Sequence, residues 1–281
     1  MEESTNIDKL SCTVRAWKQD GDRIAFVPTM GALHEGHLSL VRLAREKASR
    51  VIVSIFVNPT QFGEGEDFET YPRTIEQDFA FLESEKVDGV FLPTSDEMYP
   101  EGFQTYVINP SLSDDLCGAS RPGHFKGVLT VVLKLLNLVQ PDLAVFGLKD
   151  YQQFALIRTM VKDLCMPLDI LGAETVRESS GLAMSSGNLR LSDGELQAAP
   201  ALYKAMAKSK ERFLEGERSI KKLIETFEIE IGKPGVFRID YVSIREQGSL
   251  SRFDTDECHS PVMLCAAYLG SVRLIDNLCL S

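Results

Sequence analysis

Two histidines three residues apart, His34 and His37, are the residues whose type and spacing point most directly to chemistry. They follow a short apolar run that starts at Ile24 and indicates a buried strand, and apolar residues then recur at helical spacing over Leu38–Ala48. Unpaired backbone N–H groups and the positive end of the dipole converge at a helix start, which favours an anion there. Two imidazoles at that position predict phosphate chemistry on a nucleotide.

A histidine pair at this spacing could also be half of a metal site or an ordinary helix start. The chain has four histidines, lacks an HExxH motif, and has no Asp or Cys near enough in sequence to complete a familiar metal spacing. We therefore expect phosphate binding and no protein-held metal.

Uncharged amides come directly after the next apolar run. Asn58 and Gln61 follow the β-branched residues Val51–Val57, which indicate a strand buried on both faces. Such amides suit the hydroxyl, carboxylate or amine groups of a small polar substrate. An Asn-Pro sequence also closes ordinary turns, so a purely structural role stays open.

A third strand-turn-helix junction carries Lys149 and Asp150, just after the apolar residues Leu143–Phe146. The lysine could meet a phosphate as a point charge, and Asp150 could cap the helix or accept from a ribose or a metal-bound water. Gln152 and Gln153 follow in the first turn. A plain Asp cap beside a solvated lysine is the alternative interpretation.

Residues 176–188 are rich in glycine and serine yet contain leucine and methionine. Ser185, Ser186 and neighbouring backbone N–H groups could wrap a polyphosphate as a mobile flap. A flexible loop between domains would have the same composition.

The 281 residues suffice for one large or two modest domains, and 44% hydrophobic with 25% charged residues is typical of a globular protein in water. A net charge of -11 disfavours general attraction to nucleic acid or to an anionic membrane, so neither is an expected partner. The start is acidic and polar, the six cysteines form no CxxC pair, and the most apolar run is too short for a bilayer. We therefore expect a cytoplasmic enzyme with reduced thiols.

Strand-like and helix-like segments alternate over the first two-thirds of the chain, which predicts an α/β fold with a Rossmann-like doubly wound parallel sheet. Pro28 and Gly31 are expected to break the first strand. The further expected elements are helices at 74–85, 128–139 and 150–164 and strands at 89–92, 143–146 and 169–172. The three polar loops all follow strands, so they can share one cleft at the carboxyl ends.

Composition changes near residue 176, so we expect a nucleotide- and substrate-binding domain over 1–175 and a smaller α+β domain over 176–281. The second domain is expected to contain helices at 193–207 and 219–228, a strand at 238–245, and a hairpin of 262–269 with 272–275.

Together these segments resemble the pantoate–β-alanine ligases of the nucleotidyltransferase superfamily, over nearly the whole chain. Phe26–His37 matches the first signature of that family throughout, and Arg121–Phe125 and Leu274–Asn277 match later ones. Paired histidines alone would indicate only the superfamily. The Asn–Gln loop, the Lys-Asp-Tyr-Gln-Gln run and the Met-Ser-Ser run narrow the resemblance to this ligase.

The resemblance implies an ATP-dependent ligase that makes pantothenate, a coenzyme A precursor. The carboxylate of pantoate would attack the α-phosphorus of ATP to give pantoyl adenylate and pyrophosphate. The amine of β-alanine would then displace AMP. ATP is thus a substrate, Mg²⁺ would be bound with the nucleotide, and the implied assembly is a homodimer.

The resemblance also implies roles for particular residues. His34, His37 and Lys149 would be catalytic, and Asn58, Gln61 and Gln153 would contact pantoate or β-alanine. The ATP-binding residues would be Met30, Gly31, Ala32, Leu33, His34, Glu35, Gly36, His37, Gly147, Leu148, Lys149, Asp150, Val176, Met184, Ser185, Ser186 and Gly187.

Gly187 departs from the family pattern, which usually has an arginine facing the triphosphate at this place. Losing one charge-assisted contact costs about 1.5–3 kcal/mol, roughly ten- to hundredfold in binding or rate. Arg190 is the candidate to reach the same phosphates. Leu148 and Cys117 also depart from the pattern, without removing a group assigned to the chemistry.

Other functions stay open at this point. An adenylyltransferase that keeps AMP on its product also has paired histidines, and release of free AMP distinguishes the two. A class I aminoacyl-tRNA synthetase shares the pair, but 281 residues with a charge of -11 leave little room for RNA. A nucleotide-binding sensor with crippled chemistry would be consistent with Gly187, and pyrophosphate release would exclude it.

Overall fold

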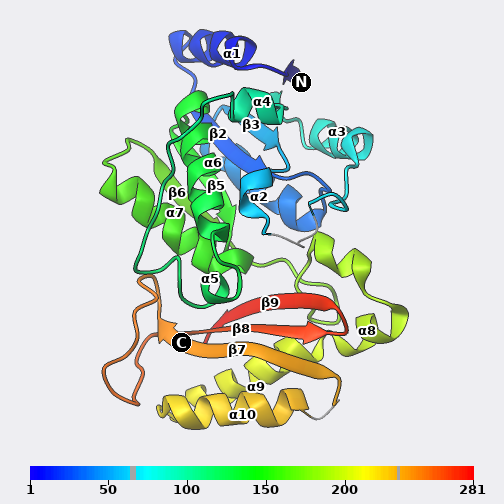
Figure 1. Ribbon diagram of the computed structural model, residues 1–281, viewed down its shortest axis with the longest axis vertical. Helices are drawn as coiled ribbons and strands as arrows, with labels where there is room; N and C mark the ends of the chain where they lie inside the picture. Colours follow the sequence, from blue (N-terminus) through cyan, green and yellow to red (C-terminus); the bar gives the residue numbers. More distant parts are fainter. Residues whose placement is uncertain (64–67, 233–234) are drawn as a thin grey trace. The chain divides into compact units, whose positions relative to one another are not determined.

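A parallel sheet of six strands forms the centre of the first of two units into which the chain folds (Figure 1). The structure is a computed structural model that describes residues 1–63, 68–232 and 235–281. The first unit comprises Met1–Leu148 with Leu156–Glu174, and the second comprises Lys149–Ala155 with Thr175–Ser281. The domain limits expected from the sequence stay a prediction.

The strand order in the first unit is β1-β4-β3-β2-β5-β6, and each neighbouring pair is parallel. The chain moves outward from β2 through β3 to β4 and then returns to β5 on the other side of β2. This reversal confirms the predicted doubly wound sheet and puts its switch point between β2 and β5. The strands are β1 (Glu2–Ser4), β2 (Ile24–Thr29), β3 (Arg50–Ile55), β4 (Gly89–Phe91), β5 (Leu143–Gly147) and β6 (Asp169–Ala173).

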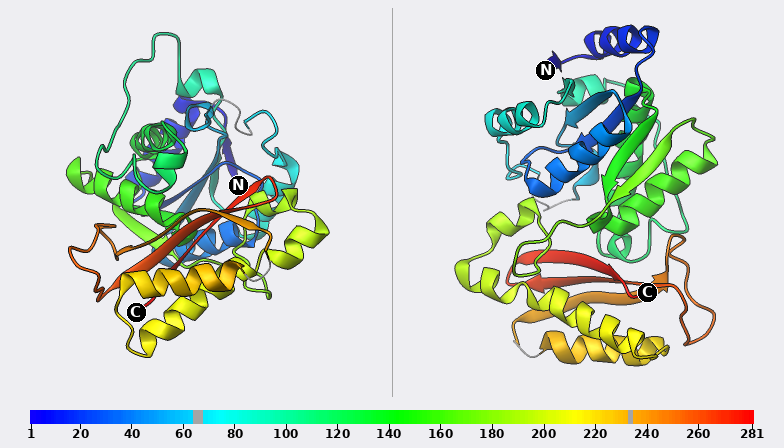
Figure 2. Two further views of the ribbon diagram at one scale, coloured as in Figure 1. Left: turned by 60° about the horizontal axis from the view of Figure 1, so that its bottom comes forward. Right: turned by 180° about the vertical axis from the view of Figure 1, so that it is seen from behind.

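Helices cover both faces of this sheet (Figure 2). Ala25 and Val27 of β2 pack in one apolar cluster with Val41 of α2, and the intervening Phe26 is directed to the opposite face because strand side chains alternate. The helices are α1 (Ile7–Gln19), α2 (Glu35–Lys47), α3 (Ile75–Ser84), α4 (Ser95–Met98), α5 (Cys117–Ser120), α6 (His124–Val139) and α7 (Tyr151–Asp163), with 3-10 turns η1 (Pro59–Gln61) and η2 (Leu148–Asp150). β1, α1, α4 and α5 were not predicted from the sequence.

Pro28 does not break β2, contrary to the sequence-based expectation. The strand continues to Thr29, and Pro28 pairs with Ser54 of β3. On its other side β2 pairs with β5 only at Ala25 and Phe26. The missing N–H of Pro28 therefore costs no ladder bond on that side.

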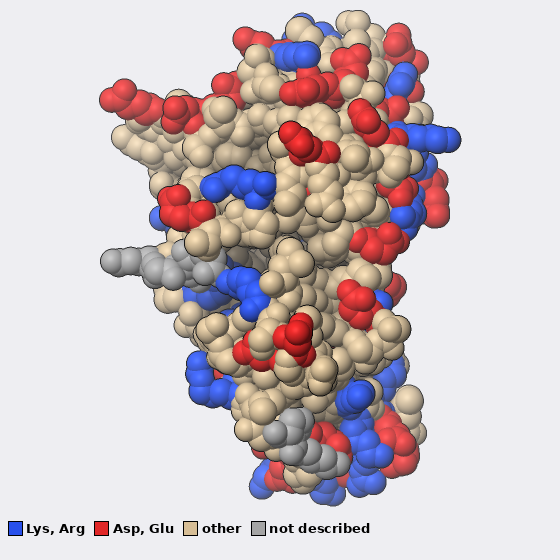
Figure 3. All heavy atoms as spheres, turned by 90° about the vertical axis from the view of Figure 1, so that its right-hand side faces the viewer, with Lys and Arg blue, Asp and Glu red and all other residues tan. Residues whose placement is uncertain are grey.

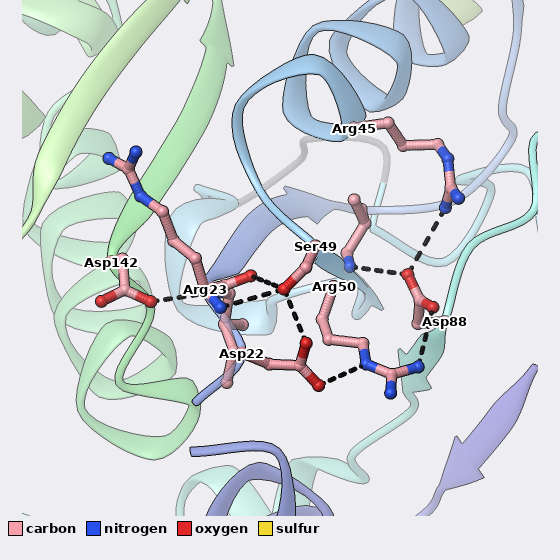
Figure 4. Close-up of polar contacts among 9 residues, drawn as sticks. Asp22, Arg23, Arg45, Ser49, Arg50, Asp88 and Asp142 are labelled. Carbon is pink, nitrogen blue, oxygen red and sulfur yellow. Dashed lines mark hydrogen bonds and ion pairs between the residues drawn. The ribbon is translucent and has the colours of Figure 1, made fainter. Parts of the chain in front are cut away.

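A polar cluster closes the amino-end edge of the sheet (Figure 4). Arg50 donates to Asp22 at 2.7 Å and to Asp88 at 3.4 Å, and Asp88 also accepts from the backbone N–H of Val51 at 2.9 Å. The Arg50 guanidinium lies 5.2 Å from the ring centroid of Trp17. These contacts fasten the starts of the strands, whereas the polar loops of interest follow the strand ends.

The second unit is built on an antiparallel sheet in the order β7-β8-β9. Its strands are β7 (Phe237–Glu246), β8 (Pro261–Leu269) and β9 (Val272–Cys279). Helices α9 (Ala201–Leu214) and α10 (Ile220–Gly232) pack on one face through a core that includes Met206, Phe227 and Cys265. The short α8 (Asp193–Ala198) and the 3-10 turn η3 (Ser186–Arg190) precede them. This arrangement confirms the smaller α+β unit.

Two expected elements of the second unit had the wrong limits. The helix expected over 193–207 is two helices, because Pro200 lacks an N–H and is the N-cap of α9 instead of continuing α8. The strand expected over 272–275 runs on to Cys279, so it includes Asp276 and Asn277, both paired with β8. In the part of the chain that is described, no helix is long and apolar enough to cross a bilayer.

Candidate active site

The paired histidines lie at the start of α2, as the sequence predicts. His34 is the N-cap, and its Nδ1 accepts the backbone N–H of Gly36 at 3.1 Å. Nδ1 of His37 accepts the backbone N–H of His34 at 3.3 Å, which completes a reciprocal capping box. The two ring centroids are 4.2 Å apart. The histidines thus satisfy helix-start donors and hold each other in place.

This capping determines which ring nitrogen carries the proton. A nitrogen that accepts an N–H cannot itself be protonated, so Nδ1 is bare in His34 and in His37. The proton of each neutral ring is therefore on Nε2. Both imidazoles are donors at Nε2, at the end of a helix whose dipole favours anions.

Asp78 orders the loop between β2 and the histidines, and the sequence analysis missed it. The buried carboxylate accepts the N–H of Ala32 at 3.0 Å and that of Leu33 at 2.8 Å, and Thr74 Oγ1 donates to it at 3.1 Å. These bonds hold a tight bend in which Gly31 has φ +82° and Ala32 has φ 50°. Asp78 lies four residues before the fully buried Leu82, and this helical spacing was the available signal.

Asn58 and Gln61 lie together after β3, in contact with the same loop. The buried amide of Asn58 donates to Gln61 Oε1 at 3.0 Å and accepts from Tyr99 Oη at 2.7 Å. Gln61 is thereby oriented so that its Nε2 donates, and it reaches Met30 Sδ at 3.1 Å. The Asn58 amide orients Gln61, and a direct substrate contact by Asn58 stays a prediction.

His124 fastens the backbone of Gln61 from α6. Its Nδ1 lies 2.8 Å from the carbonyl oxygen of Gln61, and its Nε2 lies 3.1 Å from Nη1 of Arg121. A carbonyl only accepts and a guanidinium only donates, so the proton of His124 is on Nδ1. Gly127 allows the close approach of α6, because a Cβ there would lie 2.3 Å from Thr60 O. This histidine lies in the matched run Arg121–Phe125, but no role was predicted for it from the sequence.

Lys149 and Ser185 belong to the second unit and line one cavity there, together with Asn188 and Asp276. Ser185 caps the η3 turn by accepting the N–H of Gly187 at 3.2 Å. Within the described part of the chain, the Lys149 ammonium has no hydrogen-bond or ion-pair partner. An ammonium group without a partner, beside a turn capped by a serine, is suited to binding a phosphate.

The remaining residues that the sequence predicts for the site lie close in the chain to the histidine pair, to Lys149 or to the Ser185 turn. Glu35 is ion-paired with Arg42, whose hydrogen bond lowers the pKa of that carboxyl and keeps its negative charge compensated. The side chain of the half-buried Gln153 makes no hydrogen bond to another described residue. The carbonyl of Val176 accepts the N–H of Met184 at 3.0 Å. Gly36 lies in the first turn of α2, Gly147 ends β5, Leu148 and Asp150 lie in η2, and Ser186 begins η3.

Acidic and basic side chains of the described residues are interspersed on the face drawn in Figure 3, so charge of one sign does not gather in one broad patch there.

The family model for pantoate-beta-alanine ligase matches residues 3–279. This chain belongs to the pantoate–β-alanine ligase family. The pantothenate synthetase of Shewanella oneidensis is 50% identical over 277 residues, which cover 98% of this chain and 98% of that protein. The pantothenate synthetase of Shewanella halifaxensis is 49% identical and covers 97% and 96% of the two chains.

Solved structures of pantoate–β-alanine ligases have the same fold. The pantothenate synthetase of Thermus thermophilus superposes with a TM-score of 0.94 at 41% identity, over 100% of this chain and 99% of that one. The ligase of Francisella tularensis, described as complexed with beta-gamma ATP and beta-alanine, superposes with a TM-score of 0.81 at 35% identity, over 100% and 98% of the chains.

Proposed function

We propose that this member of the ligase family condenses pantoate with β-alanine, with cleavage of ATP, through a pantoyl adenylate. In the first step a carboxylate oxygen of pantoate bonds to the α-phosphorus of ATP, and the bond from that phosphorus to the bridging oxygen breaks. Pyrophosphate leaves with the bonding electrons. In the second step the amine of β-alanine attacks the acyl carbon, AMP leaves, and the nitrogen loses a proton as the amide forms.

The observation that carries the proposal is the tautomer of the histidine pair. His34 and His37 both use Nδ1 to accept backbone N–H groups, so each neutral ring carries its proton on Nε2, at a helix start. The first step moves negative charge onto the leaving pyrophosphate, and preorganised donors stabilise such a transition state. In the proposal these two donors meet the triphosphate.

The second unit supplies further phosphate ligands in the proposal. Lys149 adds a full positive charge, and Ser185 and Ser186 add hydroxyl and backbone donors at the η3 turn. Mg²⁺ accompanies the nucleotide and neutralises part of its phosphate charge. Among the described residues there is no group of three or more His, Cys, Asp or Glu side chains that could hold a metal ion.

Amide groups select the other substrates in the proposal. Gln61, held by Asn58 and His124, presents Nε2–H groups that suit the hydroxyls and carboxylate of pantoate. Gln153 is a second such amide. AMP is a good leaving group, so the second step depends on delivery of the unprotonated amine more than on a strong protein acid.

The resemblance also leads us to infer a homodimer that works in the cytoplasm. Light scattering coupled to gel filtration tests the assembly, with a mass near twice 31.3 kDa expected. A mass near 31.3 kDa would contradict it.

The reaction itself is tested by incubating the chain with MgATP and pantoate and measuring pyrophosphate and AMP. Pyrophosphate with pantoate alone, and free AMP only after β-alanine is added, are the expected results. Pyrophosphate without AMP in the presence of β-alanine would indicate instead an adenylyltransferase that keeps AMP on its product.

A further inference from the structure

Two neighbouring polar residues of β9, Asp276 and Asn277, are buried. They are 5% and 8% exposed. Buried polar groups are costly unless they are hydrogen-bonded, so their partners indicate why these two are there. Those partners lie in the two segments of the second unit to which the proposed function assigns phosphate ligands.

Asp276 holds Arg177, at the base of the segment that leads to Ser185. Nη1 of Arg177 donates to one carboxylate oxygen at 2.6 Å and Nη2 donates to the other at 2.9 Å. The Arg177 guanidinium also lies 3.9 Å from the ring centroid of Tyr203 on α9. The two parallel hydrogen bonds to Asp276 and the stacked Tyr203 ring together fix the orientation of the Arg177 guanidinium.

Arg177 in turn closes the hairpin that precedes the serine turn. Nη1 donates to the carbonyl of Gly181 at 3.2 Å, and the backbone of Arg177 bridges to Ala183. Asn188, within η3, donates to the Ala183 carbonyl at 3.0 Å. A continuous set of contacts therefore runs from Asp276 to the turn that contains Ser185 and Ser186.

Asn277 fastens the other segment. Its Nδ2 donates to the backbone carbonyl of Lys149 at 2.8 Å, and its own backbone N–H donates to Asp276 Oδ1 at 2.8 Å. The two residues thus share one hydrogen-bond network, with Lys149 at one end and the serine turn at the other. Lys149, Ser185 and Asp276 also line the same cavity.

We propose that Asp276 and Asn277 are positioning residues, which hold the Lys149 ammonium and the Ser185 turn in the mutual arrangement that binds the phosphates of ATP. This inference rests on the proposed function of Lys149 and of the serine turn as ATP ligands. Neither Asp276 nor Asn277 needs to touch the nucleotide. Displacement of a ligand group by about 1 Å is enough to cost on the order of 100-fold in rate.

The first test is Asn277→Ala, which removes the donor to the Lys149 carbonyl and adds no charge. The dissociation constant of MgATP alone, measured by calorimetry on the full chain, should rise about tenfold, and the KM for pantoate should stay unchanged. In a Lys149→Ala background, Asn277→Ala should weaken MgATP binding by less than about twofold, because the group it positions is gone.

A second variant covers the possibility that Asn277→Ala does not fold. Arg177→Lys keeps the charge beside Asp276 but loses the bidentate pairing, and it should also weaken MgATP binding. Arg50→Lys is the matched control, since Arg50 likewise pairs with carboxylates and an aromatic ring, at the amino-end edge of the first unit. The control should leave MgATP binding unchanged.

The outcomes separate the inference from the function on which it rests. Unchanged MgATP affinity in folded Asn277→Ala or Arg177→Lys, or an equal loss in the Lys149→Ala background, would overturn the positioning role. Failure of the unmodified chain to release pyrophosphate from MgATP and pantoate would instead overturn the proposed function, whatever the affinities of the variants.

Discussion

His34 and His37 both cap the start of α2. The backbone N–H of His34 donates to Nδ1 of His37, and the centroids of the two rings are 4.2 Å apart. Each side chain therefore has a structural nitrogen and a donor nitrogen. An amide side chain can replace either one, because Asn places its oxygen near the position of Nδ1 and Gln reaches that of Nε2.

His34→Asn separates the two roles. Asn is among the best N-caps, so the free energy of unfolding should change by less than about 0.5 kcal/mol. Loss of the Nε2–H donor should lower the rate of pyrophosphate release on the order of 100-fold. Urea denaturation and a stopped-flow pyrophosphate assay measure the two effects. Equal activity of His34→Asn and the unmodified chain would show that the Nε2 donor is dispensable.

Asp78→Asn should disturb the loop before the histidines. The amide can accept only through one atom, so one of the two N–H groups, of Ala32 or of Leu33, would face another donor. We expect a loss of about 1–3 kcal/mol in the free energy of unfolding and a higher KM for MgATP. Glu76→Gln, an equal change of charge at an exposed site on the same helix, is the control. If both variants behave alike, the loop does not depend on Asp78.

Arg190 is expected to replace the arginine that the family usually has where this chain has Gly187. A Cβ added to Gly187 would lie 3.9 Å from Nη2 of Arg190, so the guanidinium already lies beside that position. Arg190→Ala should slow pyrophosphate release roughly ten- to hundredfold. Arg212→Ala, which removes another exposed arginine of the same unit, should not.

Gly187→Arg completes this test. The nearest atom to the added Cβ would be Ser185 Oγ at 3.4 Å, which is ordinary contact, so a Cβ is accommodated there. Added to Arg190→Ala, it should restore the rate of pyrophosphate release. Added to the otherwise unmodified chain, it should change that rate little. A large gain in the unmodified chain would mean that Arg190 does not serve the phosphates.

Tyr99 should make stability depend on pH at the alkaline end. Burial raises the pKa of its phenol, although hydrogen bonds with Thr60 and Asn58 oppose the rise. The folded chain then keeps the proton to higher pH than the unfolded chain, so this contribution is complete below about pH 10 and is lost as pH rises through the folded pKa. Urea midpoints of the unmodified chain should fall more steeply above about pH 10 than those of Tyr99→Phe. Parallel curves would contradict this.

Local patterns in the sequence predicted the class of fold, but not β1, α1, α4 or α5. The β-branched run Val51–Val57 predicted the buried strand β3, although β3 ends at Ile55. Proline was a weaker signal, since Pro28 lies within β2 instead of ending it. His34 and His37 could be assigned to a helix start because a cap and the apolar period that follows it are adjacent in the chain. The roles assigned to these residues in binding remain predictions.

Long-range partners are what the sequence could not show. Asp78 acts on a loop 45 residues earlier, and Asp276 pairs with an arginine 99 residues away, so neither partner can be read from spacing. The polar pair Asp276–Asn277 even caused the last strand to be ended too early, since it interrupts the apolar pattern there. Whether a polar side chain can be buried depends on the hydrogen-bonding partners that the fold places beside it. A single sequence does not show those partners.

The most direct test of the account is the release of pyrophosphate and AMP from MgATP and pantoate, with and without β-alanine. We predict pyrophosphate with pantoate alone, no free AMP until β-alanine is added, and loss of both products in a chain that lacks the Nε2 donors of His34 and His37. Absence of pyrophosphate under both conditions, with MgATP still bound, would contradict the account and indicate a nucleotide-binding protein whose adenylation chemistry has been lost.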